Sequence, residues 1–132
     1  MPSHPRFLPV VRAAVSELGA ACGLPEPECR GITLAVDEAL ANIIRHAYKN
    51  RYDREIEVHC QAGADKIEFR ILDRGEPADQ ARICAQPMDA EALSGRGTHM
   101  IRSIMDEVCY EQVHEGNQLR LSKRLPADAL LD

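Results

Sequence analysis

Residues Glu28–Tyr48 read ECRGITLAVDEALANIIRHAY, and this segment sets the architecture of the chain. Apolar residues recur in it at steps of three and four, which is the spacing of one face of an amphipathic helix. The members of this face are Ile32, Val36, Ala39, Leu40, Ile43 and Ala47. Pro27 stands just before the segment, and proline is tolerated in the first turn of a helix. The pattern predicts one long helix from about residue 28 to residue 48.

A shorter helix and a β-hairpin flank this segment. From Arg6 to Cys22, apolar residues again follow a helical stripe, and Gly23 ends it. After the long helix, residues 56–60 and 67–71 alternate apolar and polar side chains on either side of a turn at Gly63–Asp65. This alternation predicts a hairpin with one buried face.

The second half of the chain adds a loop, a helix and another hairpin. Residues 74–94 show no sustained period, and irregular chain of this length is uncommon in a domain unless it is a functional loop or lid. A helix is predicted to start near Gly97, and Val108–His114 with Gln118–Leu125 predict a second hairpin. Grouped helices and adjacent strand pairs predict an α+β fold, a two-layer α/β sandwich with helices on one face of a mainly antiparallel sheet.

Length and composition fit one domain. The chain has 132 residues, of which 45% are apolar and 28% charged. We therefore expect a single domain over residues 1–132, with a core at about 6–125 and a possible loose tail at 126–132. The formal charge of −5 argues against direct binding to nucleic acid or to an anionic membrane surface. No stretch resembles a membrane span or a signal peptide, so the expected location is cytoplasmic.

The cysteines show no metal-binding spacing. Cys22, Cys29, Cys60, Cys84 and Cys109 contain no pair separated by two residues. The simplest interpretation is a set of reduced thiols that act mostly as small core residues.

Three polar residues follow one another at helical spacing within Glu28–Tyr48. Glu38, Asn42 and His46 are four residues apart, so they share a stripe at the border between the apolar face and solvent. The amide oxygen of Asn42 suits a hard cation such as Mg²⁺, and Glu38 can accept a proton from an attacking hydroxyl. Taken alone, the same spacing also fits an ordinary helix surface.

Two glycine-containing segments offer further candidate binding residues. Asp73 ends an alternating strand, where its carboxylate can accept a hydrogen bond from an exocyclic amine, and Gly75 permits a close backbone turn. Gly95-Arg96-Gly97-Thr98 leads into an apolar helix, whose free N–H groups and dipole favour phosphate. Each segment alone also fits a plain turn or a flexible helix entry.

Taken in order, these motifs resemble a known family. Glu38-x-x-x-Asn42-x-x-x-His46-Ala47-Tyr48, Asp73-x-Gly75-x-Pro77 and Gly95-x-Gly97 are followed by Met100-Ile101, Met105-Asp106-Glu107-Val108 and the run Gly116–Lys123. The pattern resembles the anti-sigma-factor serine-protein kinases of the gyrase, histidine-kinase and MutL ATPase superfamily. The resemblance covers about Arg6 to Leu125 and implies the ATP-binding fold named after Bergerat.

The resemblance implies a role for each motif. The position of Glu38 is that of the general base, and the position of Asn42 is that of the Mg²⁺ ligand. Asp73 would bind the adenine amino group with Gly75 beside the ring. The nucleotide-binding set would also include His46, and the phosphates would lie against the segment Gly95, Arg96, Gly97 and Thr98. In this sequence Thr98-His99 replaces the leucine that usually follows the second glycine.

The implied activity is ATP-dependent phosphorylation of a serine on a small anti-anti-sigma protein of the STAS type. The resemblance also implies possible sequestration of a sigma factor, and it is compatible with a homodimer. One alternative is a nucleotide-responsive binding protein with little or no kinase activity. Another is a detached histidine-kinase catalytic domain, which is disfavoured because His4, the only histidine ahead of the long helix, lies outside the first helix.

Overall fold

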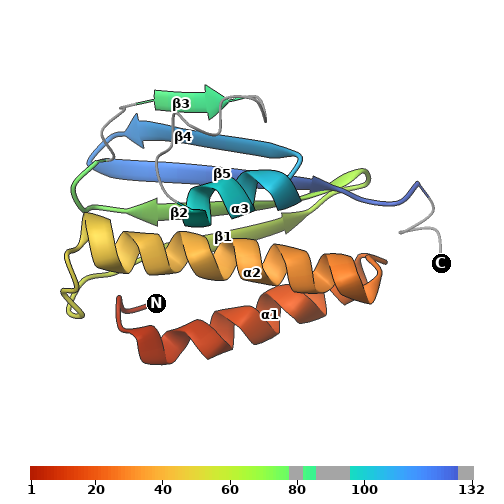
Figure 1. Cartoon of the computed structure of the whole chain (residues 1–132), viewed down its shortest axis with the longest axis horizontal. Helices are drawn as coiled ribbons and strands as arrows, with labels where there is room; N and C mark the ends of the chain where they lie inside the picture. Colours follow the sequence, from red (N-terminus) through yellow and green to blue (C-terminus); the bar gives the residue numbers. More distant parts are fainter. Residues whose placement is uncertain (78–81, 86–95, 128–132) are drawn as a thin grey trace.

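The described α-helices gather on one face of an antiparallel sheet (Figure 1). The computed structural model describes residues 1–77, 82–85 and 96–127. Its α-helices are α1 (Leu8–Ala21), α2 (Glu26–Asn42) and α3 (Arg96–Ile104). A short 3₁₀ turn, η1 (Pro5–Phe7), precedes α1, and a π-helix, η2 (Ile43–Ala47), follows α2. Helix α2 contacts both α1 and α3, so it forms the middle of the helical layer.

The sheet joins the two predicted hairpins through their inner strands. Its strands are β1 (Glu57–Ala62), β2 (Lys66–Asp73), β3 (Arg82–Ala85), β4 (Glu107–Val113) and β5 (Gly116–Arg124). The spatial order within the described residues is β1-β2-β5-β4-β3, and every neighbouring pair is antiparallel. Helices on one face of this sheet confirm the predicted α+β sandwich.

Strand β3 corrects the prediction for residues 74–94. That stretch was expected to be irregular throughout, but Arg82–Ala85 pairs with β4 at the edge of the sheet. A strand of four residues is too short to produce a recognisable alternation of apolar and polar side chains. Its extended conformation is therefore evident only from its pairing with β4. The other residues of this stretch beyond Pro77 lie outside the described part of the chain.

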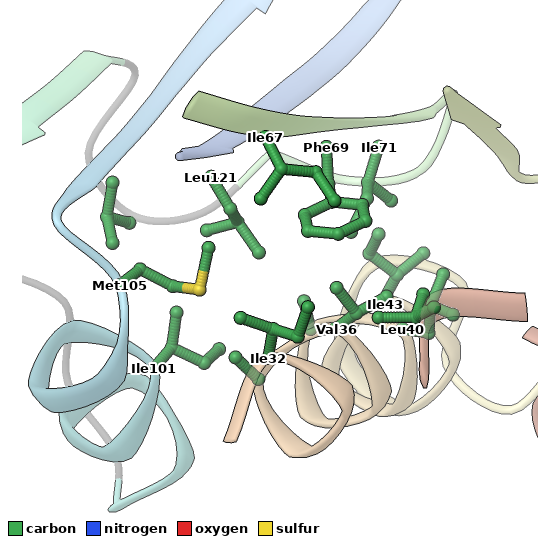
Figure 2. Packing of buried hydrophobic residues seen from close by; sticks show 14 of the residues in the cluster. Ile32, Val36, Leu40, Ile43, Ile67, Phe69, Ile71, Ile101, Met105 and Leu121 are labelled. Carbon is green, nitrogen blue, oxygen red and sulfur yellow. The ribbon is translucent and has the colours of Figure 1, made fainter. Parts of the chain in front are cut away.

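The core lies between α2, α3 and the inner face of the sheet (Figure 2). On β2, Ile67, Phe69 and Ile71 are fully buried, as their alternation predicts. They pack in one cluster with residues from α2 and η2, from α3 and the residue after it, and from β5: Ile32, Val36, Leu40, Ile43, Ile101, Met105 and Leu121. The next inward position of β2 is Asp73, which places a carboxylate at the end of the core face.

The end of the long helix differs from its prediction. Regular α-helix stops at Asn42, and the chain continues as the π-helix η2 up to Ala47. The N–H of Tyr48 then donates to the carbonyl of Ile43 at 2.9 Å. Residues Lys49 and Asn50 both adopt positive φ, at 51° and 61°. π-Helical turns are rare and often occur at functional sites, and no periodicity of apolar residues predicts them.

The cysteines differ in part from the expectation of reduced core thiols. Cys22 and Cys29 are buried and free, whereas Cys60 is free and exposed. Cys109 is buried and disulfide-bonded, which corrects the prediction for this residue. Among the described residues, no helix has the length and apolar character needed to cross a membrane.

Candidate functional site

Glu38 and Asn42 meet at one guanidinium group. Both side chains are half-buried on α2, in agreement with their predicted border position. The Nη2 atom of Arg45 donates to Oε1 of Glu38 at 3.1 Å and to Oδ1 of Asn42 at 2.9 Å. The two oxygens therefore approach the same positive charge. We call Glu38, Asn42 and Arg45 the oxygen cluster.

His46 lies in η2 and is exposed. The π-helical winding changes its angle to Asn42 from the one that a continuous α-helix would give. Within the described residues, no side-chain hydrogen bond joins His46 to the oxygen cluster, whose bonds run from Arg45 to Glu38 and Asn42. Its contribution to binding a ligand stays a prediction.

Asp73 is held in a second cluster at the end of β2. It is 6% exposed, and its Oδ1 accepts from the N–H of Gly75 at 2.8 Å and from Nδ2 of Asn117 at 3.0 Å. Asn117 faces Asp73 across β2 and β5, and it also donates to the carbonyl of Gly75 at 3.1 Å. We call Asp73, Gly75 and Asn117 the carboxylate cluster. Burial raises the pKa of Asp73, and the two hydrogen bonds partly offset that rise.

The raised pKa predicts an unusual pH dependence of stability. As pH rises above the ordinary pKa of Asp, the unfolded chain loses its Asp73 proton before the folded protein does, so the free energy of unfolding falls. The fall should end once pH exceeds the raised pKa of the folded state. We expect urea denaturation to show this loss in wild type and a smaller loss in Asp73→Asn, which cannot ionise there. Parallel pH profiles for the two proteins would contradict the assignment.

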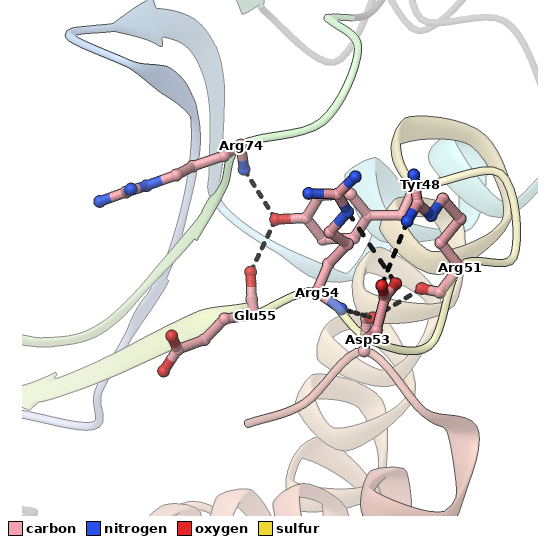
Figure 3. A network of polar contacts seen from close by, with 7 residues as sticks. Tyr48, Arg51, Asp53, Arg54, Glu55 and Arg74 are labelled. Atoms are coloured by element: carbon pink, nitrogen blue, oxygen red, sulfur yellow. Dashed lines mark hydrogen bonds and ion pairs between the residues drawn. The ribbon is translucent and has the colours of Figure 1, made fainter.

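The carboxylate cluster packs directly against the end of η2. A Cβ atom on Gly75 would lie 2.4 Å from the carbonyl oxygen of Ala47. The N–H of Glu76 donates to that same oxygen at 2.9 Å. Figure 3 shows the neighbouring bond, in which the N–H of Arg74 donates to the hydroxyl of Tyr48 at 2.8 Å. Gly75 is thus required here by close backbone contact. The structure connects the segment bearing Glu38 and Asn42 to the turn bearing Asp73.

Gly116 makes a second close approach to this cluster. It opens β5 after a two-residue turn, and a Cβ atom there would lie 2.2 Å from the carbonyl oxygen of Asp73. The preceding residue, Glu115, adopts a φ of 64°. The β4–β5 turn therefore fits tightly against the end of β2, which places Asn117 beside Asp73.

The segment Gly95-Arg96-Gly97-Thr98 lies only partly within the residues that the structure describes. Arg96, Gly97 and Thr98 form the first residues of α3, so a helix begins where the sequence predicted it. Gly95 lies outside the described residues. The proposed contacts of all four residues with phosphate stay predictions.

A cavity of about 380 Å³ borders the carboxylate cluster. Its lining includes Tyr48, Arg54, Leu72, Asp73 and Asn117. Neither Glu38 nor Asn42 lines it, so this cavity does not by itself join the two clusters. Within the described residues, no group of three or more His, Cys, Asp or Glu side chains could hold a metal ion. A cation at Asn42 would therefore need oxygens from another source, such as phosphate.

Arg45 and Asn117 were not predicted as site residues. The sequence gives no signal that Arg45 belongs to a site, because an arginine three residues after an asparagine is common on a helix surface. Asn117 reaches Asp73 across 44 residues, and only the strand register brings the two together. The sole sequence signal for Asn117 was its place beside Gly116 in the run Gly116–Lys123.

Comparison with known proteins covers nearly the whole chain. Residues 1–123 match the sequence profile of the family described as histidine kinase-like ATPase domain. The serine-protein kinase RsbW of Bacillus subtilis (strain 168) is 26% identical over 133 residues, which is 95% of this chain and 82% of that protein. The serine-protein kinase RsbW of Listeria innocua is 28% identical over 116 residues, 82% of this chain and 74% of that protein.

A solved structure has the same fold. The histidine kinase domain from the Erythrobacter litoralis EL346 blue-light activated histidine kinase superposes with a TM-score of 0.59 at 16% sequence identity. The alignment covers 95% of this chain and 62% of that chain. The sheet and its helical layer therefore have the fold of that histidine kinase domain.

Proposed function

We propose that this chain, which belongs to the histidine kinase-like ATPase domain family, binds Mg-ATP and phosphorylates a serine of a partner protein. Relatives that are 26–28% identical over most of the chain carry the name serine-protein kinase. The observation that carries the proposal is the convergence of Glu38 Oε1 and Asn42 Oδ1 on one cationic group. An amide oxygen that can bind Mg²⁺ and a carboxylate that can accept a proton are the groups that phosphoryl transfer requires, so their proximity supports the proposal.

The proposed roles follow from the two clusters. Asn42 would hold Mg²⁺ through Oδ1 once Arg45 moves aside, and Mg²⁺ would supply charge neutralisation on the phosphates. Glu38 would accept the proton of the serine hydroxyl as the serine oxygen bonds to the γ-phosphorus and ADP leaves. The carboxylate cluster would bind adenine through Asp73, whose Oδ1 is already occupied by Gly75 and Asn117.

The remaining contacts of the nucleotide are proposed from the sequence motifs. Arg96, Gly97 and Thr98 begin α3, where free N–H groups favour an anion, and Gly95 directly precedes them. His46 would lie beside the oxygen cluster. These residues complete the proposed ATP site.

The proposed protein substrate is a small anti-anti-sigma protein of the STAS type, with possible sequestration of a sigma factor. This pairing rests on the resemblance of the motifs to anti-sigma-factor kinases. A cytoplasmic protein that uses neither a membrane nor nucleic acid as a partner fits the charge of −5. The family resemblance is also compatible with a homodimer.

A transfer experiment tests the function. The purified chain is incubated with γ-labelled ATP, Mg²⁺ and a candidate STAS-type protein, and phosphoserine is measured. Label on the partner that disappears in Glu38→Ala supports the kinase. Stable, nucleotide-dependent binding without label would instead support the alternative, a regulatory binding protein with little or no kinase activity.

Replacing Asn42 tests the metal ligand. Because Asn42→Ala removes the only proposed protein ligand, we expect ATP affinity at millimolar Mg²⁺ to fall by roughly tenfold, a loss of about 1.4 kcal/mol. When Mg²⁺ is removed with excess chelator, the affinity for ATP should differ little between Asn42→Ala and wild type. The side chain is half-buried at the surface of α2, so the fold should persist. Calorimetry that finds the same Mg²⁺ dependence in wild type and variant would contradict the assignment.

A further inference from the structure

Tyr48 joins the end of η2 to the turn after β2. Its hydroxyl donates to the carbonyl of Glu55 at 2.6 Å and accepts from the N–H of Arg74 at 2.8 Å (Figure 3). The residue is 6% exposed, and burial raises the pKa of its hydroxyl above the ordinary value for tyrosine. The hydroxyl is therefore protonated at neutral pH and can make both bonds at once.

Three successive N–H groups of the turn have defined partners. The N–H of Arg74 donates to the Tyr48 hydroxyl, that of Gly75 donates to Oδ1 of Asp73, and that of Glu76 donates to the carbonyl of Ala47. Two of these three partners belong to Ala47, the last residue of η2, and to Tyr48, the residue after it. Helix η2 also carries Arg45 of the oxygen cluster. Each bond fixes one peptide group, so the turn has little freedom to rotate relative to η2.

The orientation of the Asp73 carboxylate depends on this turn. One of its two oxygens is bound to the N–H of Gly75, and the peptide between Asp73 and Arg74 is the one that Tyr48 holds. If Arg74 lost its partner, that peptide could rotate and the carboxylate would turn with it. Recognition of an exocyclic amine requires a donor–acceptor distance near 2.9 Å and a nearly linear bond, so a small rotation would weaken it.

We propose that Tyr48 is a positioning residue for base recognition: its hydroxyl fixes the turn so that Asp73 discriminates a purine with an amine at C6 from one with a carbonyl at C6. The inference rests on the proposed function, because it concerns the nucleotide site of the kinase. Tyr48 itself would not need to touch the nucleotide. It acts through Asp73. Because the turn is bonded to Tyr48, the orientation of the base would also depend on the position of the helical segment that carries Asn42.

The test compares Tyr48→Phe with wild type for binding of ATP and GTP. We expect the dissociation constant for ATP with Mg²⁺ to rise about tenfold and that for GTP to change little, so the preference for ATP falls. Binding is measured by calorimetry below the melting temperatures of both proteins. Tyr52→Phe is the matched control, because Tyr52 is 46% exposed and its ring lies beside His4. That control should keep the wild-type preference.

The outcomes separate a positioning role from a structural one. A hydroxyl that only stabilises the fold would lower the melting temperature of Tyr48→Phe and leave the ATP-to-GTP ratio unchanged, and that result would overturn the inference. In an Asp73→Asn background, Tyr48→Phe should cause no further loss of discrimination, because it acts through Asp73. Failure of wild type to bind ATP would instead refute the proposed function, and the inference with it.

Amide hydrogen exchange measured on the wild-type protein provides a second test, which does not depend on whether a variant folds. The amides of Arg74 and Glu76 should exchange more slowly when ATP is bound than when GTP is bound, because only adenine would engage Asp73. The amide of Gly63, bonded to the carbonyl of Lys66 at the other end of β2, is the reference and should not respond. Equal protection of Arg74 and Glu76 by both nucleotides would contradict the inference.

Discussion

Replacing Glu38 with glutamine is expected to slow phosphoryl transfer by about 10²–10⁴-fold, the usual contribution of a general base. Glutamine keeps the size of the side chain and its oxygen toward Arg45, but it cannot accept the serine proton. The affinity for ATP should change little, since Glu38 is proposed to act on the attacking hydroxyl. Initial rates of phosphoserine formation and the ATP dissociation constant, measured on the same preparation, check both parts.

Glu26→Gln is the matched control for this substitution. Glu26 lies on the same helix, is exposed and pairs with Arg30 at 2.9 Å, so the variant loses the same charge away from the oxygen cluster. It should transfer phosphate at the wild-type rate. A Glu38→Gln protein that keeps the full rate would exclude Glu38 as the base and would leave the oxygen cluster as a metal site at most.

Gly75→Ala is expected to lower the free energy of unfolding by roughly 1–3 kcal/mol or more and to weaken ATP binding at the same time. The new Cβ would lie 2.4 Å from the carbonyl oxygen and 2.6 Å from the carbonyl carbon of Ala47. Both are backbone atoms, so the turn or η2 must shift to relieve the contact. Either shift moves the carboxylate cluster relative to Asn42.

Gly63→Ala provides the comparison for the effect of an added methyl group. Its Cβ would lie 3.4 Å from the carbonyl oxygen of Lys66, which is close to an ordinary contact. Denaturant unfolding should show little change in this variant and a clear loss in Gly75→Ala. If Gly75→Ala unfolds at the wild-type denaturant concentration and binds ATP equally well, the contact between the turn and η2 does not matter for the site.

The parts of the fold with a long regular pattern could be predicted from the sequence. The apolar face of residues 28–48 and the alternation of Ile67, Phe69 and Ile71 both place their side chains in the core, as the structure confirms. Strand β3 could not be predicted because four residues at a sheet edge depend on their partner strand. The π-helix could not be predicted because no periodicity of apolar residues marks a π-helical turn.

The residues of the candidate site also fall into those that the sequence could predict and those that it could not. The position of Asp73 could be predicted, because it continues the inward alternation of β2 beyond the apolar residues. Asn117, Arg45 and the hydroxyl of Tyr48 could not, because their roles come from hydrogen bonds between side chains or across distant segments. The need for a glycine at position 75 could be predicted from the close backbone turn, and the structure shows the close approach to Ala47, whereas its place beside adenine stays a prediction.

Calorimetric titration of the folded wild-type chain with ATP at millimolar Mg²⁺ tests the central claim, that the two clusters bind one magnesium-bound nucleotide. We expect saturable binding of ATP that weakens in Asn42→Ala and in Asp73→Asn. Absence of any binding of ATP or ADP by protein shown to be folded would contradict it.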